Sequence, residues 1–176
     1  QAVNAVGALG GSSQVTIYNK SDGSIALGPF LMSSLGGPVG CRNNVRGYGT
    51  VTFDRLANRW VLMETTGLLG GGDLCVYVSR TPDPTANQWF AYEFPALAEP
   101  RGAKLAVWPD AYYVTSTDTT LSSAAPGGYA LDRTNMLLGL PARPPISFTP
   151  PTLAGFASFS QSMTAANLLG STAPAV

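Results

Sequence analysis

Glycine and proline interrupt this chain so often that no long regular segment fits between them. The 176 residues include 20 glycines and 14 prolines, and the segments that separate them are short, aromatic and β-branched. This composition is typical of strands joined by turns, and helix signals are nearly absent. The sequence therefore predicts an all-β protein.

The segments can be grouped into a hairpin followed by two sets of four strands. The hairpin joins Gln14–Tyr18 to Ile25–Phe30, and Asp22-Gly23 supplies the positive φ that its turn needs. The first set of four is predicted at residues 50–53, 60–63, 74–79 and 89–94. The second set is predicted at residues 104–108, 112–116, 129–133 and 146–149.

Two correspondences indicate an internal repeat. Asp54 and Asp110 each follow an aromatic residue at a turn, directly or nearly so, and each precedes an aromatic strand. A tyrosine strand leads to a basic residue at Lys20, Arg80 and Arg133, which lie 60 and then 53 residues apart. Familiar propeller blades repeat at roughly 40–50 residues, so the spacing is a little long.

We therefore predict antiparallel four-stranded blades of a partial β-propeller, with about two and a half blades over residues 1–152. Residues 153–176 are predicted to form a linker or a packed tail. A propeller ring needs about four to eight blades, so the missing part would come from another chain, from a longer chain, or from stacked copies. The alternative fold is a β-sandwich.

Charge and residue types limit the function classes. Ten basic and ten acidic residues cancel, so no net field attracts nucleic acid or an anionic membrane. The sequence contains no histidine, which removes the commonest general base and metal ligand. Charged residues make up only 11%, and a surface with so little charge favours association. No apolar run approaches the length of a membrane span.

The two cysteines, Cys41 and Cys75, are expected to form a disulfide. It would close a loop of about 35 residues and stabilise the fold by roughly 3–4 kcal/mol on the chain-entropy model. The alternative is a pair of buried free thiols. A bridge indicates an oxidising, extracytoplasmic location, and a start at Gln1 is what signal-peptide removal would leave.

Four acidic residues are candidates for chemistry, each with a structural alternative. Asp54 and Asp110 could pair as acid and base, as glycosidase carboxylates do, but a turn-forming role is the stronger interpretation. Asp73 and Asp83 offer oxygen ligands that could hold calcium, although the two prolines beside Asp83 explain that turn without a metal. We assign no catalytic residue and no cofactor other than this calcium candidate.

Five aromatic residues form the weak candidate binding group. Alternation along strands sends neighbouring side chains to opposite faces, so part of the group would lie toward solvent. Exposed rings on a surface with little charge suit sugar stacking or a subunit interface, whereas packing between blades would bury the others. The group comprises Trp89, Tyr92, Trp108, Tyr112 and Tyr113.

Three segments, residues 54–62, 75–85 and 105–115, resemble a family of secreted bacterial β-propeller-like proteins with sialidase-like repeats and poorly defined function. The resemblance covers roughly residues 14–160 and implies further blades downstream. The chain departs from the family pattern at Gly47-Tyr48-Gly49 and at Arg101–Lys104, where the family carries acidic residues near the propeller axis. A ligand of those carboxylates would be lost here.

The leading hypothesis for function is a non-enzymatic extracytoplasmic binding or structural module, secreted or at the cell surface, that other chains or copies of itself complete. Open sheet edges would make it a homo- or hetero-oligomer, without nucleic-acid or membrane partners. The alternative is a fragment or subunit of a secreted enzyme that acts on polysaccharide and carries its catalytic residues elsewhere.

Overall fold

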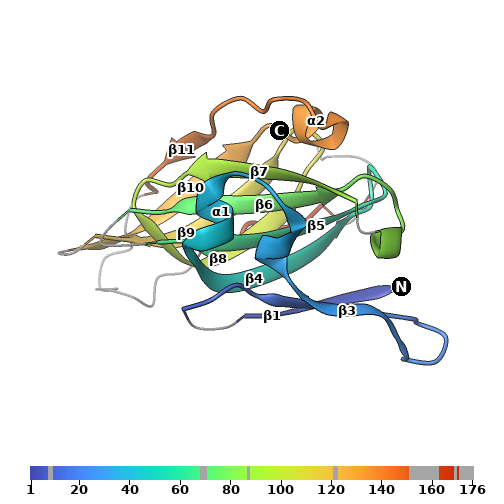
Figure 1. The fold of residues 1–176 in the computed structure, drawn as a ribbon. Coiled ribbons are helices and arrows are strands. Elements are labelled where there is room, and N and C mark those ends of the chain that lie inside the picture. Colours follow the sequence, from blue (N-terminus) through green and yellow to red (C-terminus); the bar gives the residue numbers. More distant parts are fainter. Residues whose placement is uncertain are drawn as a thin grey trace.

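A computed structural model describes residues 1–7, 10–67, 71–86, 88–120, 123–150, 163–168 and 170. The described residues form three antiparallel sheets with short helical segments between them (Figure 1). The prediction of an all-β fold is confirmed. The predicted tail lies partly outside the described residues, of which only 163–168 and 170 belong to it.

The first sheet has three strands and the other two have four each. The first sheet has the order β1 (Ala2–Val6), β2 (Gln14–Tyr18) and β3 (Ile25–Leu31). The middle sheet has the order β4 (Val45–Asp54), β5 (Arg59–Thr66), β6 (Asp73–Ser79) and β7 (Trp89–Pro95). The last sheet has the order β8 (Glu99–Val107), β9 (Tyr112–Thr119), β10 (Ala124–Leu131) and β11 (Ile146–Phe148).

Short helices occupy the longer connections. The 3₁₀ segment η1 (Met32–Leu35) and helix α1 (Val39–Asn43) link the first sheet to the middle one. A second 3₁₀ segment, η2 (Pro84–Ala86), lies in the β6–β7 turn, and helix α2 (Arg133–Leu138) lies between β10 and β11.

The sequence located the strands well and missed two local features. Every predicted segment corresponds to a strand, but β1 was not predicted, because Ala2–Val6 is short and has no aromatic residue. Arg133, predicted to end a strand, instead begins α2. The Asp132 carboxylate accepts a hydrogen bond from the Asn135 N–H and caps this helix, and Gly139 ends it with a left-handed backbone.

The three sheets are stacked in layers, with the middle sheet covered on both faces (Figure 1). One apolar core lies between the middle and last sheets and includes Val61, Met63, Val76, Tyr112 and Val114. A second core lies between the first and middle sheets and is built from Val15, Met32, Cys41, Leu62, Cys75, Tyr77 and Trp89. The middle sheet therefore belongs to both cores.

The strands β4 and β8, which begin the middle and last sheets, carry a β-bulge at the same place. The register shifts around Tyr48 in β4 and around Gly102 in β8. Both residues adopt a left-handed backbone, with φ of 56° at Tyr48 and 58° at Gly102. The bulges allow the two sheets to be aligned residue by residue.

This alignment shows that equivalent side chains face the same way. Trp60, Leu62 and Tyr77 of the middle sheet pack toward the first sheet. The register equates them with three residues of the last sheet that pack toward the middle sheet, namely Tyr112, Val114 and Tyr129. Each sheet thus turns the same face to the sheet before it.

The bulge at Tyr48 yields a prediction. A residue with a Cβ costs about 1–2 kcal/mol in the left-handed region, whereas glycine adopts it freely. We expect the Tyr48→Gly variant to be more stable by about 1 kcal/mol than Tyr48→Ala, because both lack the ring and only alanine keeps the strain. Urea unfolding of the two variants measures the difference, and an alanine variant as stable as the glycine variant would refute it.

Candidate functional site

A buried ion pair joins the middle sheet to the last one. The Asp54 carboxylate, fully buried at the end of β4, receives the Arg133 Nε–H at 2.8 Å and Nη2–H at 3.1 Å. The Tyr112 hydroxyl donates to the same carboxylate at 2.8 Å. Arg133 also donates to the Pro109 carbonyl at 3.0 Å. Charge and hydrogen bonding are therefore satisfied without solvent.

Asp54 also forms its own turn, as the structural interpretation predicted. Its Oδ1 accepts the backbone N–H groups of Leu56 and Ala57, each at 3.0 Å. Since its oxygens accept five hydrogen bonds and are sealed from solvent, Asp54 cannot act as an acid or base on a substrate. Asp110 lies at the surface, where its carboxylate accepts the Tyr113 hydroxyl at 2.6 Å.

A second buried carboxylate, Glu64 on β5, connects the middle sheet to the first sheet. Glu64 is fully buried and accepts the Ser13 N–H at 2.8 Å and the Ser12 hydroxyl at 3.0 Å. Burial raises the pKa of Glu64 from 4.5 to about 7, against the lowering effect of these bonds and one from Tyr77. The fold therefore favours the protonated carboxyl.

The Cys41–Cys75 disulfide forms as predicted and ties α1 to β6. Both cysteines are completely buried in the core between the first and middle sheets. Its formation fits an oxidising compartment. Among the residues that the structure describes, no helix is long and apolar enough to cross a membrane.

The outward face of the last sheet, which we call the last end face, is the main candidate site. Its residues are Tyr113, Thr115, Gly128, Ala130, Ile146 and Phe148, aligned in two rows across β9, β10 and β11. Ile146 is 74% exposed and Phe148 is 52% exposed. The Phe148 ring lies over Gly128, where a Cβ would clash with it. The face is therefore exposed at Ile146 and Phe148 on β11, whereas Thr115 on β9 and Gly128 on β10 are buried.

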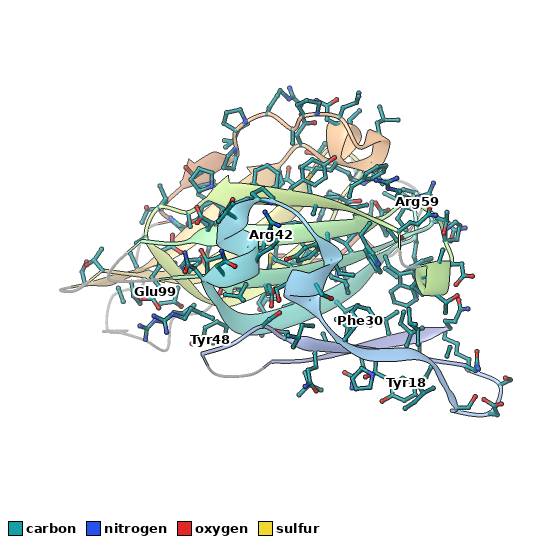
Figure 2. The ribbon with its side chains drawn as sticks, viewed as in Figure 1. Tyr18, Phe30, Arg42, Tyr48, Arg59 and Glu99 are labelled. Atoms are coloured by element: carbon teal, nitrogen blue, oxygen red, sulfur yellow. A yellow bond between two sulfur atoms is a disulfide. The ribbon has the colours of Figure 1, made fainter. Side chains whose placement is uncertain are left out.

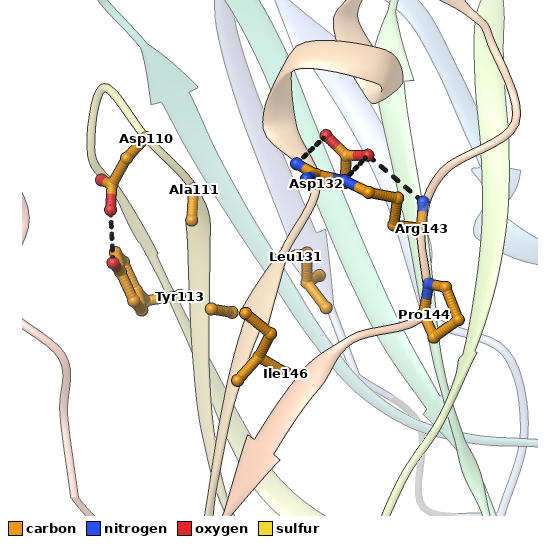
Figure 3. A pocket seen from close by; sticks show the side chains of 9 residues that line it. Asp110, Ala111, Tyr113, Leu131, Asp132, Arg143, Pro144 and Ile146 are labelled. Atoms are coloured by element: carbon orange, nitrogen blue, oxygen red, sulfur yellow. Dashed lines mark hydrogen bonds and ion pairs between the residues drawn. The ribbon is translucent and has the colours of Figure 1, made fainter.

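A shallow pocket of about 230 Å³ opens at one end of this face (Figure 3). Tyr113 and Ile146 form its apolar side, and Asp132 and Arg143 form its polar side. Arg143 Nε lies 2.8 Å from Asp132 Oδ2, and hydrogen bonds from Arg143 lower the pKa of Asp132 to about 2. Asp132 and Arg143 therefore balance each other's charge, and Asp110, which accepts the Tyr113 hydroxyl, adds a carboxylate to the pocket.

The first sheet has a comparable outward face, which we call the first end face. It carries Val6, Tyr18, Ile25 and Leu31, which alternate with residues packed inward. Val6, Ile25 and Leu31 are 60%, 57% and 46% exposed. Figure 2 shows Tyr18 on the outer side of this sheet and Phe30 on the inner side. Both ends of the stack therefore expose apolar side chains, and on the first end face the polar pair Asn4 and Thr16 lies between them.

The five predicted binding aromatics do not form one site. Tyr112 is completely buried under the Asp54–Arg133 pair, and Trp89 is 7% exposed, so these two belong to the core. Tyr92 lines an open groove of about 350 Å³ along β7, and its hydroxyl donates to the Leu140 carbonyl at 3.1 Å. Only Tyr113 lies on the last end face, whereas Trp108 adjoins it at the end of β8.

The two calcium candidates cannot share an ion. Asp73 begins β6 and Asp83 lies beyond its other end, which at about 3.3 Å per residue separates them by roughly 20 Å. Asp73 accepts the Thr66 hydroxyl, and Asp83 accepts the backbone N–H and hydroxyl of Thr85 in the η2 turn. The described residues contain no cluster of three or more metal-ligating side chains.

The comparisons leave the chain without an assigned family. No protein-family model matches the chain, and neither a curated protein nor a solved structure is significantly similar to it. The function therefore rests on the geometry of the chain itself.

The Asp54–Arg133 pair predicts a large effect of a single substitution. Replacing Arg133 by methionine leaves Asp54 buried and unpaired, so we expect a loss of about 3–5 kcal/mol in the free energy of unfolding. The matched control is Arg101→Met, because in the Arg101–Glu99 pair, separated by 3.2 Å, the two side chains are 45% and 16% exposed. This control should lose at most about 1 kcal/mol. Urea denaturation compares them, and equal losses would contradict the role of Arg133.

Glu64 predicts a pH dependence of stability. Because its pKa in the fold is about 7 and its ordinary value is 4.5, its contribution is complete below pH 4.5 and is lost as the pH rises to 7. This loss corresponds to about 3 kcal/mol. Wild type should therefore lose stability from pH 5 to pH 8, whereas the Glu64→Gln variant should not. The unfolding free energy of the variant minus that of wild type should rise over this range. A constant difference would refute the raised pKa.

Proposed function

We propose that this chain is a non-enzymatic extracytoplasmic structural module that assembles with copies of itself through its two end faces. The first end face of one copy would pack on the last end face of the next. Stacked in this way, the sheets of successive copies continue a propeller-like series of blades. Such a contact is heterologous, so it closes into a ring or extends as a filament.

The observation that carries this proposal is the equivalence between the last end face and a covered face. In the middle sheet, the residues equivalent to Tyr113, Thr115, Gly128 and Ala130 are Val61, Met63, Val76 and Val78. These four are completely buried beneath the last sheet. The last sheet repeats this face with no following sheet in the described part of the chain. By analogy with the middle sheet, the last end face can therefore pack against a further sheet.

A second copy provides a matching surface. The first end face is the face of the first sheet opposite to the one that packs on the middle sheet. That face exposes Val6, Ile25 and Leu31, and burying them against Ile146 and Phe148 would remove apolar surface from water at about 25 cal/mol per Å². The low charged fraction of 11% offers little repulsion between copies.

The polysaccharide-enzyme alternative has less support from the candidate residues. This alternative carries its catalytic residues elsewhere, so its support in this chain would be a sugar-binding surface, and the candidate aromatics are divided between the core and separate surfaces. The last end face, by contrast, repeats the face of the middle sheet that packs on the last sheet. We therefore favour assembly over sugar chemistry.

The test replaces Phe148 by aspartate and measures sedimentation velocity over a range of concentrations. Wild-type protein should associate as its concentration rises, and Phe148→Asp should weaken this association at least tenfold because it places a charge in an apolar contact. The matched control is Leu97→Asp, since Leu97 is 50% exposed but lies in the β7–β8 connection. Wild-type protein that remains a monomer at every concentration would overturn the proposal.

A further inference from the structure

One segment of the chain already lies against the last end face. Residues 163–168, which we call the strap, run beside β8 and β9. The Thr115 hydroxyl donates to the Met163 carbonyl at 2.7 Å. Since Val114 points into the core, Thr115 points to the outward face, so the strap reaches the surface that a second copy would cover.

The strap also covers the free edge of the last sheet. In the strand order β11-β10-β9-β8, β8 is an edge strand with unpaired backbone groups. The Val107 N–H donates to the Asn167 side-chain oxygen at 2.8 Å, and the Leu168 N–H donates to the Val107 carbonyl at 3.1 Å. Both backbone groups of Val107 are therefore used by the strap.

A third contact lies next to this edge, at the end of β8. The Trp108 indole Nε1–H donates to the Ala166 carbonyl at 2.7 Å. The strap's hydrogen bonds are exposed or partly buried, and its exposed residues include Ala166 and Asn167. Hydrogen bonds of this kind contribute about 0.5–1.5 kcal/mol each, so a partner sheet that buries apolar area can replace them.

Resting on the proposed self-assembly, we infer that the strap is a displaceable cap that limits this assembly. It occupies the β8 edge and the Thr115 end of the last end face, and it leaves Ile146 and Phe148 uncovered. An incoming copy first contacts these exposed residues and then displaces the strap. The strap thereby protects the edge of the free chain against indiscriminate strand pairing.

The test weakens the strap in the full chain at residues outside both end faces. Asn167→Ala removes the acceptor for the Val107 N–H, and Trp108→Phe removes the indole donor to the Ala166 carbonyl while keeping an aromatic ring. The double variant should associate at least tenfold more tightly than wild type in sedimentation velocity, because fewer hydrogen bonds must break when the strap detaches from the last sheet. The control is Thr81→Val, which removes a similar hydrogen bond, from the Thr81 hydroxyl to the Asp83 carbonyl, in a remote turn.

Hydrogen exchange provides the second readout. The Leu168 amide should lose protection when wild-type chains associate, since its bond to Val107 breaks. If the double variant associates as tightly as wild type, or less tightly, while Phe148→Asp still weakens association, the strap inference fails and the assembly proposal stands. If no chain associates at any concentration, both fail.

Discussion

A β-sheet has two faces, and apolar residues on either face must be covered by something. The middle sheet satisfies this requirement on both sides, against the first sheet through the Cys41–Cys75 core and against the last sheet through the Val61–Tyr112 core. Asp54 and Arg133 reinforce the second contact with a buried ion pair. Within the described residues, each end sheet packs on another sheet through one face only. Their apolar outward faces follow directly from the same repeat that builds the interior.

Much of the fold could be predicted from the sequence because strands and turns leave strong local signals. Glycine and proline marked the turns, and the hairpin at Gln14–Phe30 and both sets of four strands were found. The missed strand Ala2–Val6 lacks such signals and depends on pairing with β2. Arg133 was assigned to a strand because its partner, Asp54, lies 79 residues away in the sequence. Long-range pairs of this kind leave no local pattern.

The candidate site could be predicted only in part. Tyr113 belonged to the predicted aromatic group, and its exposure follows from its place on an end sheet. Tyr112 and Trp89 were grouped with it because sequence alone does not reveal which face of a strand is covered. The sequence predicts Ile146 and Phe148 as part of the last strand but does not indicate that their side chains are exposed. Glu64, whose pKa is raised, gave no signal in the sequence, since its partners Ser12 and Ser13 lie about 50 residues earlier, in the β1–β2 connection.

The central claim is that the first end face of one copy binds the last end face of another, and mixing two blocked chains tests it most directly. One chain carries Ile25→Asp, which blocks the first end face, and the other carries Phe148→Asp, which blocks the last. Each keeps one intact face, so native mass spectrometry should find the 18.3 kDa monomer in each separate solution. The mixture should contain a particle of twice that mass with one chain of each kind. A mixture that contains only monomers would contradict the account.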